Sequence, residues 1–339
     1  MNKTKRNATI IDVARKANVS IATVSRYLNS TSYVSDEKRR RIAKAIHELG
    51  YKPSRFAKAL RKQRLFVIGI IAPNIIGDYY AKIVNTASMH ANMKGYETII
   101  SITSNDKELE DRVLDFFITR RVDGVIVCTP TMEILEKLLS LNVPVVAVDW
   151  SDPVGDYDID SVTISNKKAA YKMVKYLYSM GHKKILIITG RNDIPSSNER
   201  LEGVLEFQDR YPDLNLDIRE GSFSPKNGYE IAKEFIESGS IDVTAIFAFN
   251  DMMAFGALNA LHEKGFKVPD DISVVGFDNS YISKYTIPPL TTMKQPKKEI
   301  GITAVNILIE RIESTSFKMR REVVLPHKLI ERRSVKSLV

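Results

Sequence analysis

Residues 9–29 read TIIDVARKANVSIATVSRYLN, the pattern of two short helices joined by a tight turn. Thr9 can cap the first helix, because the carboxylate of Asp12 three residues later can reach back to the capping residue and also favours the helix dipole. Asn18-Val19-Ser20 then breaks this helix, and a second helix follows over residues 21–29. The pattern predicts a helix-turn-helix, whose second helix fits the major groove of DNA.

A third helix is expected after Ser35, ending at Gly50. Its apolar positions recur at helical spacing, and four of them are expected to face inward: Ile42, Ala43, Ile46 and Leu49. In the second helix, Val24 and Leu28 are expected to face the same interior. Three helices of this size can enclose one small core.

The first 65 residues carry most of the positive charge of the chain. They contain 17 Lys and Arg but 4 Asp and Glu, a net charge of +13. The other 274 residues contain 33 basic and 37 acidic side chains, a net of −4, which gives +9 overall. Each cation placed near a phosphate releases condensed counterions, so a compact basic segment predicts nucleic-acid binding. Helical periodicity and capping argue against the alternative, a disordered basic tail.

The next segment, Pro53 to Arg61, has proline near the start of a nine-residue helical pattern. Proline is favourable in the first turn of a helix, but nine residues are too few for a helix that is stable alone in water. A flexible linker is therefore the alternative interpretation of residues 53–65.

From Phe66 onward, short apolar runs alternate with helical patterns. The runs expected to be strands are 66–72, 97–102, 124–127, 145–148, 185–188, 244–248 and 272–276. Helices are expected between them, for example over 79–94 and after Asn166. Such alternation predicts parallel sheets with helices on both faces. Two series of comparable size predict an α/β body of two doubly wound subdomains, with ligands at the carboxyl ends of the strands.

Composition excludes several classes of protein. No stretch reaches the roughly 18 to 20 apolar residues of a membrane helix, and the first ten residues do not resemble a signal peptide. Cys128 is the single cysteine, which excludes an internal disulfide and a cysteine zinc cluster. The five histidines lie far outside ligand spacing. We therefore expect a cytoplasmic protein without a membrane partner, a metal or a cofactor.

Several motifs resemble the LacI/GalR family of bacterial transcription regulators, and the resemblance covers essentially the full chain. In the basic segment these motifs are residues 9–14, Val19-Ser20, Thr23-Val24-Ser25-Arg26 and residues 49–53. In the body they are residues 122–124, Gly181-His182, 200–203, 250–254, 275–279, 290–292, Gln295-Pro296 and 329–334. The resemblance implies a head that binds DNA and a body similar to periplasmic sugar-binding proteins.

The resemblance also implies which residues contact DNA. Ile21, Ala22 and Arg26 would face base edges, where arginine suits the O6 and N7 of guanine. Residues 53–61 would form a hinge helix, ordered when two copies pair on DNA, with Leu60 wedged into the minor groove. The full set of expected DNA contacts is Thr9, Ser20, Ile21, Ala22, Thr23, Ser25, Arg26, Asn29, Ala57, Lys58 and Leu60.

Candidate effector contacts follow the expected strands of the body. They are Tyr79, Tyr80, Asp149, Arg200, Phe223, Asn250, Asp251 and Asp278. Arg, Asn and Asp match the donors and acceptors of sugar hydroxyls, and aromatic faces suit a flat ligand or the apolar face of a sugar ring. Asp251 as a helix cap and Tyr79 as a core residue are the structural alternatives.

These expectations combine into one interpretation. Residues 1–52 form the DNA-binding domain, 53–65 the hinge, and 66–339 the effector-binding and dimerisation domain. Subdomain one covers about 66–164 and 297–322, and subdomain two about 165–296 and 323–339. We expect a repressor, acting as a homodimer or tetramer on a pseudopalindromic operator and controlled by a small effector of saccharide type.

The rival classes are a free-standing sugar-binding protein and a sugar-active enzyme on a similar fold. The basic segment opposes the first. The sequence contains no G-x-G-x-x-G after a strand, no G-x-x-x-x-G-K-[ST] and no G-x-S-x-G, so no catalytic residues are predicted. The sequence leaves open the effector's identity, the operator, and whether the effector releases DNA or strengthens its binding.

Overall fold

The chain divides into two compact units, residues 1–65 and 66–339, which we call the head and the body. The computed structural model describes residues 8–29, 32–51, 64–104, 106–140, 143–151, 158–239, 242–314 and 319–339. The expected hinge helix, with Ala57, Lys58 and Leu60, lies outside the described residues. Within the described ranges, no helix combines the length and the apolar character needed to cross a membrane.

The head contains three helices in the described residues, α1 (Ile10–Ala17), α2 (Ile21–Asn29) and α3 (Asp36–Leu49). A reciprocal capping box starts α1: the Thr9 amide donates to Asp12 Oδ2 at 2.9 Å, and the Asp12 amide donates to Thr9 Oγ1 at 3.3 Å. Asn18 ends α1 with a φ of 48°, a conformation that asparagine tolerates better than most side chains. These ends agree with the helix boundaries expected from the sequence.

The helices of the head enclose a small core. Its buried apolar side chains are Val13, Ala14, Ala17, Val24, Val34, Ile42, Ala45 and Tyr51. The expectation that Ala43 faces inward is wrong, because its side chain is exposed and Ala45 is buried instead. Residues three apart lie on nearly the same face of a helix, so Ala45 shares the buried face of Ile42 whereas Ala43 does not.

The body contains two six-stranded sheets. The first has the order β11-β5-β4-β3-β1-β2, and the second has the order β12-β10-β9-β8-β6-β7. The strands of the first sheet are β1 (Val67–Ala72), β2 (Glu97–Ile102), β3 (Gly124–Cys128), β4 (Val145–Val148), β5 (Asp160–Ile164) and β11 (Glu322–Leu325). Those of the second are β6 (Lys184–Ile188), β7 (Asn215–Arg219), β8 (Ala245–Ala248), β9 (Ser273–Asp278), β10 (Thr291–Lys294) and β12 (Lys328–Ile330). All pairs are parallel except β10 with β12.

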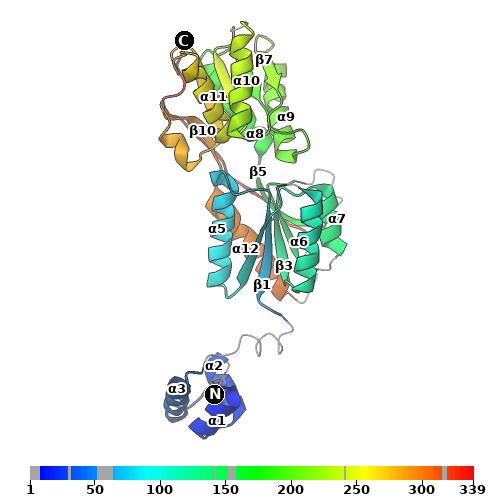
Figure 1. Ribbon diagram of the computed structural model, residues 1–339, viewed down its shortest axis with the longest axis vertical. Helices are drawn as coiled ribbons and strands as arrows, with labels where there is room; N and C mark the ends of the chain where they lie inside the picture. The colour runs from blue at the N-terminus through cyan, green and yellow to red at the C-terminus, as the bar shows by residue number, and fades with distance from the viewer. Residues whose placement is uncertain are drawn as a thin grey trace, which may run out of the picture. The chain divides into compact units, whose positions relative to one another are not determined.

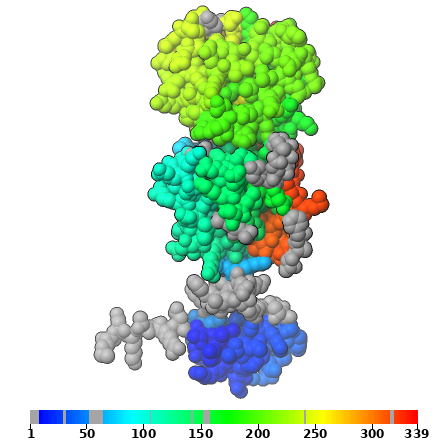
Figure 2. All heavy atoms as spheres, turned by 90° about the vertical axis from the view of Figure 1, so that its right-hand side faces the viewer, coloured from blue at the N-terminus to red at the C-terminus, as the bar shows by residue number. Residues whose placement is uncertain are grey.

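Helices cover both faces of each sheet (Figure 1), and the body has two lobes, which the space-filling view also shows (Figure 2). Lobe one has α5 (Asp78–Met93), α6 (Lys107–Thr119), α7 (Met132–Ser140) and α12 (Lys297–Glu313). Lobe two has α8 (Asn166–Ser179), α9 (Pro195–Arg210), α10 (Pro225–Glu237), α11 (Asp251–Glu263) and the 3₁₀ turn η1 (Tyr281–Lys284). α5 packs against α12, α8 against α9, and α10 against α11. Two apolar clusters lie on opposite faces of the first sheet, and a third fills lobe two.

The chain crosses between the lobes three times, between β5 and α8, between β10 and α12, and between β11 and β12. The last crossover lies later than the expected boundary after residue 322, because β11 pairs in parallel with β5 of lobe one. β11 is an edge strand whose residues alternate between exposed and half-buried, so it has no continuous apolar run to mark it in the sequence.

Candidate functional site

In the head, α2 buries one face and presents the other. Val24 is 0% exposed, whereas Ile21 is 47% exposed and Ala22 and Arg26 are also exposed. Ser20 caps the helix by accepting a hydrogen bond from the Thr23 amide at 3.2 Å. The exposed face of α2 therefore carries the three residues that, by the resemblance to the LacI/GalR family, are expected at base edges.

The other expected head contacts differ in their surroundings. Ser25 is half-buried, and the Thr9 hydroxyl donates to Asp12 Oδ2 at 2.7 Å within the capping box. Arg41 donates to the Asn18 carbonyl oxygen at 2.9 Å, which ties α3 to the turn between α1 and α2. This hydrogen bond fixes the position of the turn that leads into α2. The Asn29 side chain, Ala57, Lys58 and Leu60 lie outside the described residues.

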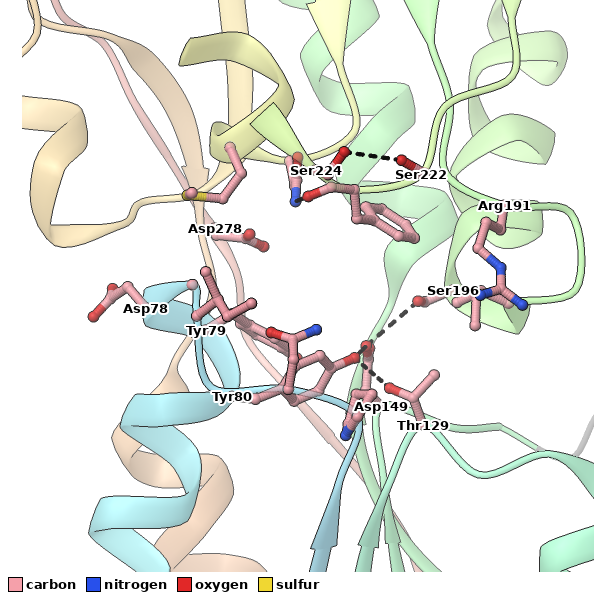
Figure 3. Close-up of a pocket in the computed structure, with 18 of the residues that line it drawn as sticks. Asp78, Tyr79, Tyr80, Thr129, Asp149, Arg191, Ser196, Ser222, Ser224 and Asp278 are labelled. Atoms are coloured by element: carbon pink, nitrogen blue, oxygen red, sulfur yellow. Dashed lines mark hydrogen bonds between the residues drawn. The ribbon is translucent and has the colours of Figure 1, made fainter. Parts of the chain in front are cut away.

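In the body, a cavity of about 360 Å³ lies between the two lobes (Figure 3). This volume is in the range of small-molecule sites. Seven of the eight expected effector residues line it: Tyr79, Tyr80, Asp149, Arg200, Phe223, Asn250 and Asp278. The carboxyl ends of parallel strands meet at this side of each sheet, so residues that are far apart in sequence come together here.

Asp251 is the eighth residue, and a direct effector contact by Asp251 is not supported. Its side chain is 0% exposed and does not line the cavity. Its Oδ1 accepts a hydrogen bond from Thr292 Oγ1 at 2.5 Å, and its Oδ2 accepts one from the Ser280 amide at 2.6 Å. Burial raises the pKa of its carboxyl, and these hydrogen bonds oppose the rise. Asp251 therefore supports the loop after β9.

Lobe one contributes two tyrosines and a carboxylate to the cavity. Tyr80 bonds to the hydroxyl of Thr129 and donates to Asp149 Oδ2 at 3.3 Å. Burial, followed by the charge of Asp149, holds the pKa of Tyr79 and of Tyr80 well above the usual range, so both phenols stay protonated donors. Asp149 is 4% exposed, and its Oδ1 has no partner among the described residues. This oxygen is an acceptor for a ligand donor.

Lobe two contributes a guanidinium that is already anchored. Arg200 lies in α9 and is 3% exposed. Its Nε donates to Asn166 Oδ1 at 2.9 Å and its Nη1 donates to the Phe249 carbonyl oxygen at 2.5 Å. Its Cζ lies 3.9 Å from the centroid of the Phe277 ring. The guanidinium has five N–H donors, so it can direct further donors at a ligand while remaining fixed.

Phe223 and Asn250 form one unit of the same wall. Asn250 caps α11 by accepting from the Met253 amide at 2.8 Å, and its Nδ2 donates to the Phe223 carbonyl oxygen at 2.9 Å. Phe223 has a φ of 63°, and its ring packs so closely on Gly190 that an added Cβ there would lie 2.0 Å from the ring. Asn250 therefore positions Phe223 and leaves little of its amide for a ligand.

Asp278 ends β9 and is 7% exposed. Its Oδ1 accepts a hydrogen bond from Gln295 Nε2 at 2.7 Å. Burial raises the pKa of this carboxyl to about 7, against the opposing charge of Arg200 and with a smaller contribution from Asp251. Near neutral pH the group can therefore serve as a donor or as an acceptor.

Other cavity residues were not singled out from the sequence. They are Pro73, Asn74, Ile76, Gly77, Asp78, Ser104, Thr129, Arg191, Ile194, Ser196, Ser222, Ser224, Pro225, Met252 and Ser280. Many follow strand ends, as Thr129 follows β3, which is a signal that the sequence did contain. Five lining residues have a positive φ: Ser104, Thr129, Asp149, Phe223 and Asp278. Strained backbone of this kind gathers at ligand sites, but no local sequence rule reveals it.

No group of three or more His, Cys, Asp or Glu side chains among the described residues could hold a metal ion. Cys128 is buried, which raises the pKa of its thiol to about 12. The lining residues of the cavity offer hydrogen-bond donors and acceptors, ring faces and charge.

Comparisons with known proteins agree with this arrangement. The family described as bacterial regulatory proteins, lacI family, matches residues 9–54, and the periplasmic binding protein-like domain matches residues 174–335. The chain is 36% identical to the HTH-type transcriptional repressor PurR of Actinobacillus pleuropneumoniae serotype 3, over 98% of this chain and 99% of the relative. A PurR repressor of Pasteurella multocida is also 36% identical, over 97% of this chain and 99% of the relative.

Among solved structures, the Lac repressor dimer bound to operator and the anti-inducer ONPF has a TM-score of 0.86 and 30% identity, over 98% of this chain and 100% of the other. A LacI family regulator of Enterococcus faecium with bound ribose has a TM-score of 0.72 and 28% identity, over 80% of this chain and 100% of the other. The relatives are transcriptional repressors matched over nearly their whole length. The chain belongs to the lacI family of bacterial regulatory proteins and is a DNA-binding transcriptional repressor controlled by a small effector.

Proposed function

We propose that the repressor binds a pseudopalindromic operator as a homodimer, with the exposed face of α2 in the major groove of each half-site. One helix-turn-helix reads few base pairs, so useful affinity requires two heads related by a two-fold axis. Ile21, Ala22 and Arg26 are the proposed base contacts, and their exposure supports this role. A tetramer would add a second operator to the same scheme. Binding to chromosomal DNA implies a cytoplasmic protein.

The effector occupies the cavity between the lobes in this proposal. The observation that carries it is the unpartnered Oδ1 of Asp149, a buried oxygen of lobe one in the cavity that Arg200 of lobe two also lines. An unpaired buried acceptor is costly, and a ligand N–H or O–H would satisfy it.

A saccharide or a sugar derivative is the first candidate for the effector. Hydroxyl groups both donate and accept, which suits a wall that combines the carboxylates of Asp149 and Asp278 with Arg200 and several serines. Ribose bound to the Enterococcus faecium regulator is a precedent in the family. The ring faces of Tyr79 and Phe223 favour a second candidate, a planar nucleobase. A thermal-shift screen of both classes separates them.

The coupling between cavity and operator is tested with the variant Asp149→Asn, which keeps the shape of the side chain and removes its charge. We expect the variant to bind the identified effector at least ~10-fold more weakly and to keep the operator affinity of the effector-free protein. In wild type, saturating operator must change effector affinity by the same factor by which effector changes operator affinity. If effector affinity is the same with and without saturating operator DNA, the proposal is contradicted.

A second test concerns the hinge. If Leu60 wedges between central base steps, Leu60→Ala weakens specific operator binding by about 1 to 3 kcal/mol and reduces DNA bending. Binding to random DNA depends on phosphate charge and should change little. Gel-shift titrations on operator and random duplexes measure both affinities. Equal losses on the two duplexes would show that Leu60 acts through packing alone.

A further inference from the structure

The two lobes are joined by hydrogen bonds on both sides of the cavity. On one side, Ser196 Oγ of lobe two donates to Asp149 Oδ2 of lobe one at 3.4 Å, and Ser151 donates to Glu199. On the other side, the Tyr281 amide of lobe two donates to Asp78 Oδ2 of lobe one at 3.2 Å. Figure 3 shows Asp78 across the cavity from Asp149 and Ser196. Hydrogen bonds therefore join the two lobes on both sides of the cavity.

The two sides differ in strength. The Asp149 contact is long for an O–H···O hydrogen bond, which is commonly about 2.7 Å. Asp78 also has a charged partner, because Lys297 Nζ donates to Asp78 Oδ2 at 2.5 Å. The same Nζ donates to the Asn279 carbonyl oxygen of lobe two at 3.0 Å. The Lys297 side chain is 10% exposed and the Asp78 side chain 31%. Asp78 and Lys297 both belong to lobe one, and each crosses to lobe two through one hydrogen bond, from the Tyr281 amide to Asp78 and from Lys297 to the Asn279 carbonyl oxygen. Hydrogen bonds to ionised groups are stronger than those between neutral groups.

The residues that make this contact line the cavity or are next to cavity-lining residues in the sequence. Asp78 precedes Tyr79 at the start of α5, and Asn279 follows Asp278. Lys297 begins α12, directly after the crossover from β10. Asn279 is itself fixed from lobe two, since Arg332 Nη2 donates to its Oδ1 at 2.6 Å and its amide donates to Thr292 Oγ1 at 3.2 Å. Movement of the lobes and movement of the cavity residues are therefore mechanically linked.

We propose that Asp78 and Lys297, which pair within lobe one, form a clasp on residues 279–281 of lobe two and so keep the lobes closed. The clasp raises the population of the closed conformation, which presents the Tyr79 wall and the Asp278 wall to one ligand. An effector that binds the closed form then binds more tightly, because the apparent dissociation constant is the intrinsic one divided by the closed fraction. Only this last step rests on the proposed function, whereas the clasp itself concerns the ligand-free body.

The double variant Asp78→Asn/Lys297→Met tests the clasp, because it removes both charges and leaves no buried charge without a partner. Spin labels on cysteines introduced at Met132 of α7 and Lys226 of α10 report the distance between the lobes in the ligand-free, full-length protein. Both positions are exposed, and the native Cys128 is buried. We expect the distance distribution of the variant to shift to longer values and to broaden.

A matched control is Asp111→Asn/Lys137→Met, which removes a 2.5 Å ion pair inside lobe one, between α6 and α7. Its distance distribution should equal that of wild type. The single variant Lys297→Arg retains the cation, so most of its molecules should stay in the closed conformation, as in wild type. If the clasp variant loses thermal stability but keeps the wild-type distance distribution, the pair is ordinary packing and the proposal is wrong. Because no effector or DNA enters this measurement, its outcome is independent of the proposed function.

With an identified effector, a second readout follows. The clasp variant should bind it at least ~10-fold more weakly, with most of the change in a faster dissociation rate. The Asp111→Asn/Lys137→Met control should bind as wild type does. An unchanged dissociation rate in a variant whose lobes have opened would show that the effector does not require the closed form.

Discussion

The two lobes of the body share one strand order but hold their cavity side chains in different ways. In lobe two, Arg200, Asn250 and Asp278 each have a protein partner at 2.7 to 2.9 Å. In lobe one, Asp149 has partners only at 3.3 and 3.4 Å through Oδ2, and none among the described residues through Oδ1. Lobe two therefore offers a preorganised wall, and lobe one offers a wall whose hydrogen bonds a ligand would complete.

This difference separates two consequences of mutation. A side chain that is already bonded to its own lobe contributes to stability before any ligand arrives. A side chain with an unsatisfied oxygen contributes little to stability and more to binding, because the ligand supplies its missing partner. Substitutions in lobe two should therefore affect folding and binding together, whereas those in lobe one should affect binding alone.

The largest effect is expected for Arg200→Leu in lobe two. The substitution leaves the Phe249 carbonyl oxygen and the Asn166 side chain without their buried donor and removes a cation from the face of Phe277. We expect a loss of about 3 kcal/mol or more in the free energy of unfolding, measured by urea denaturation of the full chain. Arg200→Ala carries the same cost, so it is a poor choice for testing the effector alone.

Arg191→Leu is the matched control for Arg200→Leu. Arg191 also lines the cavity, but its side chain is 45% exposed and pairs with Asp193 two residues away. Its substitution should change the free energy of unfolding by no more than about 0.5 kcal/mol. Similar losses for the two arginines would remove the proposed distinction between anchored and unanchored cavity residues.

The second prediction is a pH dependence at Asp278. Its folded pKa is raised by burial to about 7, above the usual value of 3.8. Between these pH values the folded state holds a proton that the unfolded state has lost, so this group lowers stability as pH rises through that window. Asp278→Asn cannot ionise and should escape the loss. Relative to wild type, the variant should gain on the order of 4 kcal/mol between pH 4 and pH 8.

Urea denaturation at several pH values measures this difference. Asp111→Asn, on the exposed surface of α6, gives the background for removing one carboxylate. A gap between wild type and Asp278→Asn that does not vary with pH would contradict the raised pKa. It would also mean that burial does not hold the carboxyl of Asp278 in its protonated form.

The sequence predicted the parts of the fold that rest on continuous apolar runs. β1, β3, β4, β6 and β8 are central strands buried on both faces, and each is visible as such a run. β7 and β11 lie at sheet edges and alternate with polar or charged residues, and β12 is only three residues long. Such strands are set by pairing with distant neighbours, which no local pattern encodes.

The same limit applies to the cavity. Residues directly after strands were predictable, because strand ends converge in this architecture. Asp251 was assigned to the effector on the same basis, but the start of α11 turns its carboxylate toward Thr292 and the Ser280 amide. Ser196 was missed because it lies inside α9, where a hydroxyl has no distinctive pattern in sequence. Thr129 was missed although it directly follows β3. Which way a side chain points depends on packing between elements, and this information is not local.

The smallest effect on stability is expected for Tyr80→Phe in lobe one. The phenol hydroxyl contacts Thr129 and lies 3.3 Å from Asp149 Oδ2, so its removal takes one weak donor from a carboxylate that faces the cavity. We expect the free energy of unfolding to fall by about 1 kcal/mol or less. Effector affinity should fall ~5-fold or more, because the ring stays while the donor that orients Asp149 is lost. Thermal unfolding and an effector titration of the same sample measure both quantities.

Thr98→Val in the same lobe removes a hydroxyl bonded to Ser88 away from the cavity, and it should leave effector affinity unchanged. A stability loss for Tyr80→Phe as large as that of Arg200→Leu would contradict the comparison. It would mean that the cavity side chains of lobe one contribute as much to the free energy of unfolding as those of lobe two.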